Sequence, residues 1–123
     1  VALLHSEGIL AGEMKHGPLA LVDETMPLIV VATRDSSYRK QESVVQQLRA
    51  RGGRLILIAS EDDEEIAAVA GESATIVRVP VVEDCLQAVV NIVPLQLLSY
   101  HITVLRGHNV DQPRNLAKSV TVE

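Results

Sequence analysis

Aromatic side chains are almost missing from this sequence of 123 residues, which has two tyrosines and neither tryptophan nor phenylalanine. Proteins that bind single-stranded nucleic acid stack bases on aromatic platforms, so this class is disfavoured and the core must be aliphatic. Positive charge is also scarce: eleven Lys and Arg against sixteen Asp and Glu leave a net charge of −5. This sign is wrong for neutralising phosphate backbones or anionic lipid, so neither nucleic acid nor a membrane is an expected partner.

Cysteine occurs once, as Cys85. One cysteine permits no intramolecular disulfide and cannot by itself build a zinc site, which favours a reducing, cytoplasmic compartment. The Cys85 thiol could be activated near a helix start, but a small buried hydrophobe is the commoner identity for such a residue. The four histidines show no metal-ligand spacing, and the glycines match no nucleotide-binding loop, so we expect neither a metal nor a cofactor.

No unbroken run of 18 apolar residues is present, so the sequence predicts neither a signal peptide nor a membrane span. The chain opens with Val1-Ala2-Leu3-Leu4, without an initiating methionine or a helix cap, which favours a fragment of a longer protein. Hydrophobic residues make up 47% and charged residues 22%, as in average globular proteins. Since a typical domain has about 150 residues, one packed domain or less is expected.

Strand and helix patterns alternate through the middle of the chain. Residues 28–32 and 55–59 are short apolar runs rich in β-branched side chains, typical of parallel strands covered on both faces. Between them, Ser36 or Ser37 is predicted to cap a helix that ends at the glycine pair 52–53. The acidic residues 62–65 predict the first turn of a second helix, through Val69, and residues 74–79 predict a third strand. This alternation predicts an α/β sandwich with right-handed crossovers.

Residues 83–105 predict one long helix with apolar side chains on nearly every side, typical of a helix buried all round. Pro94 should kink it, and Asn91, Gln96 and His101 argue against a lipid environment. A domain of this size could hardly surround such a helix, so we expect a further domain or a partner subunit to cover part of it. The remainder, 111–123, has few periodic apolar positions and predicts an ordered or ligand-docked tail.

Acid, base and imidazole groups lie together at Glu13, Lys15 and His16, directly before a Gly-Pro turn. Imidazole is the side chain best matched to proton transfer near neutral pH, and a loop edge lets it reach a ligand. From composition alone, however, a solvent-exposed or capping histidine is the commoner identity for His16.

A second candidate group lies in the tail, where Arg114, Asn115 and Lys118 stand among small or apolar residues. A lysine with apolar neighbours can be desolvated, and an unprotonated lysine acts as a nucleophile or forms a Schiff base. The alternative is an ordinary exposed tail lysine.

Three segments resemble one enzyme family. Residues 12–21, 93–98 and 111–123 closely resemble the end of the glutamine:fructose-6-phosphate amidotransferases (glucosamine-6-phosphate synthases): GEMKHGPLAL, VPLQLL and DQPRNLAKSVTVE. The resemblance covers essentially the whole chain, in order. The tail is highly specific to that family, whereas Glu-x-Lys-His-Gly-Pro alone indicates the broader sugar isomerase (SIS) fold.

For the fold, the resemblance implies a three-layer αβα sandwich with a five-stranded parallel sheet (SIS, flavodoxin-like), incomplete here at its N-terminus. Residues 1–110 would be most of the second SIS domain, and 111–123 the active-site tail. A glutaminase domain and a first SIS domain would belong to the same parent chain. The parent would be a cytoplasmic homodimer or higher oligomer.

For the function, the resemblance implies synthesis of glucosamine 6-phosphate, in the hexosamine pathway, from fructose 6-phosphate and glutamine. His16 would open the sugar ring, reaching into the neighbouring subunit's site, and Lys118 would form a Schiff base with the open ketose. Glu13 and Lys15 would orient His16 or bridge subunits, and Arg114 and Asn115 would support Lys118. The phosphate-binding loop and the proton-moving carboxylate would precede this chain, so the fragment alone is expected to be inactive.

Two non-catalytic alternatives remain. The chain could be an SIS module that binds a sugar phosphate as a sensor, or a purely structural dimerisation piece. A sensor would keep the fold and the histidine-bearing turn but has no need of the Asn-Leu-Ala-Lys tail, so the tail discriminates between sensor and enzyme.

Overall fold

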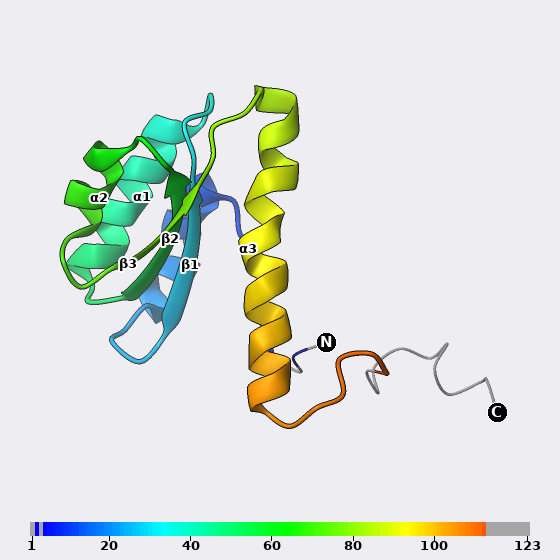
Figure 1. Cartoon of the computed structure of the whole chain (residues 1–123). Helices are drawn as coiled ribbons and strands as arrows, with labels where there is room; N and C mark the ends of the chain where they lie inside the picture. Colours follow the sequence, from blue (N-terminus) through cyan, green and yellow to red (C-terminus); the bar gives the residue numbers. More distant parts are fainter. Residues whose placement is uncertain (1, 3, 113–123) are drawn as a thin grey trace. The chain divides into compact units, whose positions relative to one another are not determined.

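The computed structural model describes residue 2 and residues 4–112. In chain order the elements are two 3₁₀ helices, η1 (Ala11–His16) and η2 (Pro18–Leu21), then β1 (Pro27–Ala32), α1 (Tyr38–Ala50), β2 (Arg54–Ser60), α2 (Glu64–Ala70), β3 (Thr75–Val79) and α3 (Asp84–Leu105) (Figure 1). They fall into two compact units. The first is Gly8–Asn91, and the second combines the residues before Gly8 with those from Ile92 onward.

The first unit is built on a parallel sheet in the order β1-β2-β3. Leu28 pairs with Leu55, and Ile56 pairs with Thr75, so the central strand β2 is hydrogen-bonded on both edges. Its residues are almost all buried, as its continuous apolar sequence predicted. The predicted α/β class with parallel strands is therefore confirmed, and the described residues contribute three strands to the sheet.

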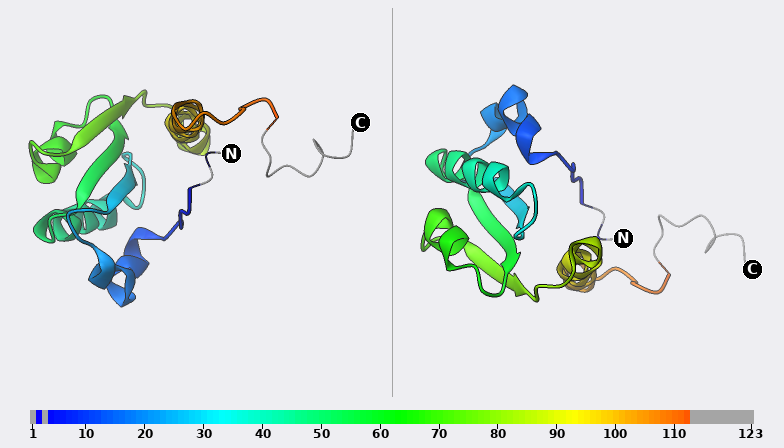
Figure 2. Two further views of the ribbon diagram at one scale, coloured as in Figure 1. Left: turned by 90° about the horizontal axis from the view of Figure 1, so that it is seen from below. Right: turned by 90° about the horizontal axis from the view of Figure 1, so that it is seen from above.

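Helices α1 and α2 lie side by side on one face of this sheet (Figures 1 and 2). Strand order follows chain order, and consecutive right-handed crossovers in one direction place their helices on the same face. The core between them is aliphatic apart from Tyr38, with Val45, Leu48, Leu57 and Ile66 at most 2% exposed. The predicted helices and their apolar faces are thus confirmed.

The start of α1 differs from the serine cap that the sequence predicted. Ser37 stands at its N-cap, but its side chain makes no capping hydrogen bond. A capping side chain needs an extended backbone, whereas Ser37 is already helical at φ −95° and ψ −6°. Asp35 organises the start instead: its Oδ1 accepts from the Ser37 amide at 2.7 Å and its carbonyl accepts from the Tyr38 amide at 3.1 Å. The predicted serine cap was wrong, while α2 is capped by Asp63.

Helix α3 has the predicted length, and the described residues of this chain do not bury it all round. Many large apolar side chains along it are exposed: Leu86, Val89, Ile92, Val93, Leu97, Tyr100, Val104 and Leu105. A helix that is apolar on every side needs neighbours on every side, and the described residues supply them for only part of its circumference. Pro94 lies inside the helix without ending it.

By length and composition alone, α3 could also cross a membrane, with a mean hydropathy of 1.6 over its best 18-residue window. The sequence, which has no unbroken run of 18 apolar residues, had predicted no membrane span. Core helices of soluble proteins pass the same test. The polar side chains Gln87 and Asn91 of α3 hydrogen-bond to one another at 2.9 Å, and Asn91 donates to Thr33 Oγ1 at 2.9 Å, so this part of the helix has polar neighbours.

Candidate functional site

The acid-imidazole group lies on η1, which is anchored by its apolar side. Ala11 and Met14 pack against the buried core, and η1 packs against α1. In a 3₁₀ helix, residues three apart lie on the same side. Ala11 and Met14 therefore share the inner side, and Glu13 and His16 share another side of the same helix.

Glu13, Lys15 and His16 are all exposed. Within residues 2 and 4–112, their side chains form no hydrogen bond or ion pair. Only the backbone fixes them: the Glu13 amide donates to the Leu10 carbonyl at 2.8 Å. The structure thus brings Glu13 and His16 to one side of η1 and exposes the imidazole to solvent. A group that exchanges a proton with this imidazole would have to come from a substrate or from another part of the protein.

Gly17 ends η1 at φ 145° and ψ −60°, a conformation that side-chain-bearing residues rarely adopt. No heavy atom lies within 4 Å of where a Cβ would stand, so the requirement for glycine is conformational and not steric. The next turn begins at once, because the Ala20 amide donates to the Gly17 carbonyl at 2.9 Å. Gly17 therefore sets the direction in which the chain leaves His16.

The predicted tail residues Arg114, Asn115 and Lys118 lie outside the described residues, so the structure does not test whether they meet His16. It does show how the chain leaves α3. Gly107 has φ 70°, its amide donates to Val104 and the His108 amide donates to Thr103, which is a Schellman motif. Asn109 Oδ1 then accepts the amides of Asp111 and Gln112 at 2.9 and 3.0 Å.

Cys85 is exposed in the first turn of α3, so the prediction that it is a buried hydrophobe was wrong. In the part of the chain that the structure describes, no three His, Cys, Asp or Glu side chains gather closely enough to hold a metal ion.

Asp63 connects the loops that follow β1 and β2. From the sequence, this residue could not be distinguished from its acidic neighbours in the row 62–65. The side chain of Asp63 is fully buried. Its Oδ1 accepts from the Ile66 amide at 3.2 Å, which caps α2, and from Arg34 Nη2 at 2.9 Å. The Arg34 guanidinium also lies over the Tyr38 ring, 5.1 Å from its centroid. Asp63 thereby joins the start of α2 to the loop that follows β1.

The second carboxylate oxygen of Asp63 and the Tyr38 hydroxyl are both buried, and neither has a partner with good hydrogen-bond geometry among the described residues. They are nevertheless close enough to affect each other's protonation. Burial and the Asp63 carboxylate raise the pKa of Tyr38 well above its ordinary value. Burial alone would raise the pKa of Asp63, but contacts with Tyr38, the Ile66 amide and Arg34 outweigh it, so the pKa lies below 3.8.

Arg78 closes the network from β3. Its Nη1 donates to the carbonyl oxygens of Ser60 and Asp63 at 3.1 and 2.7 Å. The Ser60 hydroxyl in turn accepts from the Arg34 amide at 3.1 Å. Ligands of open α/β sheets bind at the carboxyl ends of the strands. Here that edge is tied together by hydrogen bonds, which makes it a rigid support.

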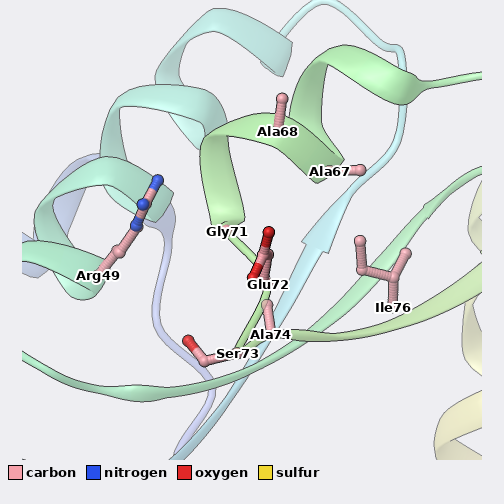
Figure 3. Close-up of a pocket in the computed structure, with 8 residues that line it drawn as sticks. All are labelled: Arg49, Ala67, Ala68, Gly71, Glu72, Ser73, Ala74 and Ile76. Atoms are coloured by element: carbon pink, nitrogen blue, oxygen red, sulfur yellow. The ribbon is translucent and has the colours of Figure 1, made fainter.

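A hollow lies elsewhere, between the ends of α1 and α2 and the start of β3 (Figure 3). It is an open depression of about 790 Å³ lined mainly by small residues. Its one cation, Arg49, is already engaged, because Nη1 donates to the Val69 carbonyl at 2.9 Å. The hollow sits at the amino end of the sheet and contains none of the predicted site residues, so we do not assign it to the chemistry.

Comparison with known proteins connects these features to a family. The family model of the SIS domain matches residues 2–106. Over all 123 residues the chain is 68% identical to glutamine–fructose-6-phosphate aminotransferase (isomerizing) 1 of Arabidopsis thaliana, and 54% identical to the enzyme of that name from Thermus thermophilus. It spans 18% and 20%, respectively, of the lengths of these relatives.

A solved structure agrees with this assignment. The C-terminal domain of glucosamine-fructose-6-phosphate aminotransferase from Francisella tularensis matches 89% of this chain and 30% of its own length, with a TM-score of 0.81 and 38% identity. The resemblance found in the sequence is confirmed by these matches. Since the family model covers more than half of the residues, the chain belongs to the SIS domain family.

Proposed function

We propose that this chain is the C-terminal isomerase part of an enzyme that makes glucosamine 6-phosphate from fructose 6-phosphate and glutamine. The observation that carries this proposal is the 68% identity to a glutamine–fructose-6-phosphate aminotransferase over every residue, the tail included. A match that includes the tail favours the enzyme over a sugar-phosphate sensor, which has no need of the tail.

His16 acts in ring opening. The cyclic ketose opens when the anomeric hydroxyl loses a proton and the ring oxygen gains one, and an imidazole can shuttle that proton at neutral pH. Support comes from its placement: the side chain is exposed and has no partner within the described part of its own chain, so it is free to enter a neighbouring subunit's site. Glu13 and Lys15, which lie on η1 beside His16, orient it or bridge subunits in the assembled enzyme.

Lys118 acts as the nucleophile. Its unprotonated Nζ attacks C2 of the open ketose, and water leaves to form an imine. Ammonia from glutamine then displaces the lysine nitrogen, and a proton moves from C1 to C2 on a carboxylate outside this chain. Arg114 and the apolar tail residues favour the neutral amine, since a nearby cation and desolvation both lower the pKa of a lysine. Asn115 supports Lys118 in this role.

The partners follow from this assignment. Fructose 6-phosphate and glucosamine 6-phosphate are the small-molecule ligands, and the glutaminase domain and the first SIS domain belong to the same parent chain. The parent is a cytoplasmic enzyme of the hexosamine pathway and works as a homodimer or larger, without nucleic acid or membrane. The exposed apolar side of α3 offers area for these contacts. The same surface favours the second candidate function, a non-catalytic dimerisation module.

Trapping the imine tests the proposal. The full-length parent enzyme is reduced with borohydride in the presence of fructose 6-phosphate, and its peptides are mapped by mass. We expect the sugar adduct on Lys118 and its loss in Lys118→Arg, which keeps the charge but cannot form the imine. Lys40→Arg, an exposed lysine on α1, is the matched control. An adduct on another lysine, or near-normal turnover of Lys118→Arg, would contradict the assignment.

A separate variant tests His16. His16→Ala should slow turnover of the cyclic sugar far more than that of an open-chain analogue, because only the cyclic substrate needs ring opening. Equal losses on both substrates would show that His16 does not act in that step.

A further inference from the structure

One large side chain attaches the histidine-bearing helix η1 to the core. Four of the six residues of η1 are exposed: Gly12, Glu13, Lys15 and His16. The other two, Ala11 and Met14, are partly buried and pack against the core, where η1 lies beside α1 (Figure 2). Because an alanine side chain is a single methyl group, Met14 supplies most of this apolar contact.

Hydrogen bonds add nothing to this attachment within the described residues. The amides of Glu13 and Ala20 donate to the carbonyl oxygens of Leu10 and Gly17, three positions earlier, at 2.8 and 2.9 Å. Bonds of this kind hold each 3₁₀ turn together, but they do not fix the turn against α1. The N-cap of η1 makes no side-chain hydrogen bond either. The position of η1 therefore depends on apolar packing, to which Met14 contributes most.

The location of His16 follows from that of Met14, which stands two positions earlier on the same short helix. The imidazole has no hydrogen-bond partner in the described part of its own chain, so its backbone alone determines from where it projects. A displacement of a reacting group by about 1 Å can lower a rate by about a hundredfold. A side chain that fixes η1 can thus affect the chemistry without touching the substrate.

We propose that Met14 is a positioning residue that acts through His16, because its packing holds η1 where the imidazole can reach the sugar ring. The consequence for catalysis rests on the proposed role of His16 in ring opening, whereas the packing does not. This role requires apolar bulk and not the sulfur atom. Leucine, with a similar volume, should therefore replace Met14, whereas alanine would leave a void and release η1.

The test compares Met14→Ala with Met14→Leu in the full-length parent enzyme. Met26→Ala is the matched control, because it removes the same atoms from the chain's second methionine, which is exposed and directly precedes β1. Met14→Val removes fewer atoms and takes the place of Met14→Ala if that variant does not fold. Turnover is measured with fructose 6-phosphate and with 5-deoxyfructose 6-phosphate, which lacks the hydroxyl that closes the furanose ring and needs no ring opening.

We expect Met14→Ala to lower kcat with the cyclic sugar by about ten- to a hundredfold, with smaller effects on KM and on turnover of the open-chain sugar. Met14→Leu and Met26→Ala should keep normal turnover. Met14→Ala combined with His16→Ala should lose no more than His16→Ala alone, since both changes remove one function. Equal losses on both sugars, no recovery in Met14→Leu, or a double variant whose loss is the product of the single losses would overturn the proposal.

His16→Ala in the same assay separates this inference from the proposed function. If His16→Ala slows both sugars equally, the proposed role of His16 fails, and with it the catalytic consequence of Met14. Amide hydrogen exchange of a peptide covering residues 11–16 then decides the packing role. Faster exchange in Met14→Ala than in Met26→Ala supports the attachment of η1 through Met14, and equal exchange in the two variants overturns it.

Discussion

Removing the Asp63 carboxylate should loosen one end of the sheet. In Asp63→Ala, α2 loses its N-cap, which contributes about 1 kcal/mol. The Tyr38 hydroxyl has no hydrogen-bond partner among the described residues even in the unmodified protein, so its burial adds no new cost in this variant. Arg34 is half-exposed and returns to solvent, so its lost ion pair contributes little. We therefore expect the free energy of unfolding to fall by about 1–2 kcal/mol.

Urea unfolding of the full-length protein, combined with amide hydrogen exchange of peptides from α2 and β2, measures this loss locally. Asp62→Ala is the matched control, because Asp62 is an exposed carboxylate one position earlier with no partner among the described residues. A loss for Asp63→Ala within about 0.5 kcal/mol of the control would refute the network.

The same residue predicts a pH dependence with a definite sign. The pKa of Asp63 in the folded protein lies below its ordinary value of 3.8, so its stabilising effect is complete above that value. The effect is lost as the pH falls through the lower, folded-state pKa. Asp63→Asn keeps a capping oxygen but removes the titration. As the pH falls below about 4, we expect the hydrogen-exchange rates of the α2 amides to rise less steeply in Asp63→Asn than in the protein that keeps Asp63.

Two glycines give further predictions. In Gly53→Ala the new Cβ would stand 2.6 Å from Leu28 Cδ1 and 3.2 Å from a backbone oxygen, so we expect a loss of about 1–3 kcal/mol in urea unfolding. Gly12→Ala, where no atom lies within 4 Å, should be neutral by comparison. Gly17→Ala meets no atom but forces φ away from 145°, so turnover should fall through a displaced His16, with unfolding changed by no more than about 1–3 kcal/mol; unchanged turnover would refute this.

The parallel strands and their helices could be predicted from the sequence, because a strand that is buried on both faces has an unbroken run of apolar residues. β2 reads Arg-Leu-Ile-Leu-Ile-Ala-Ser, and only a strand covered from both sides tolerates that many consecutive apolar residues. The cap of α1 could not be predicted in the same way. Asp35, Ser36 and Ser37 are all capable of capping, and the choice depends on which of them keeps an extended backbone.

The role of Asp63 was missed for a related reason. Four acidic residues in a row, 62–65, satisfy the helix dipole equally well, so composition gives no reason to single out one of them. The distinguishing signal is spacing: Asp63 stands three residues before Ile66, the first buried residue of α2, and an N-cap side chain accepts from the amide three positions later. Asp63 is buried against Arg34 and Tyr38, which lie more than twenty positions earlier in the sequence. Only the folded chain brings them together, so the local sequence could not predict this burial.

The hydrogen bonds at the strand ends contrast with the surroundings of His16, the proposed proton-transfer group. The carboxyl ends of the strands are joined by hydrogen bonds of Arg34, Asp63 and Arg78. The His16 imidazole, in contrast, forms no hydrogen bond among the described residues of its own chain. A proton-transfer group needs a fixed orientation relative to its substrate. Since η1 fixes only the backbone of His16, the orientation of the ring must come from what it meets. This favours a His16 that becomes competent only in an assembled site, and it explains why its position had to be predicted from a motif and not from its surroundings.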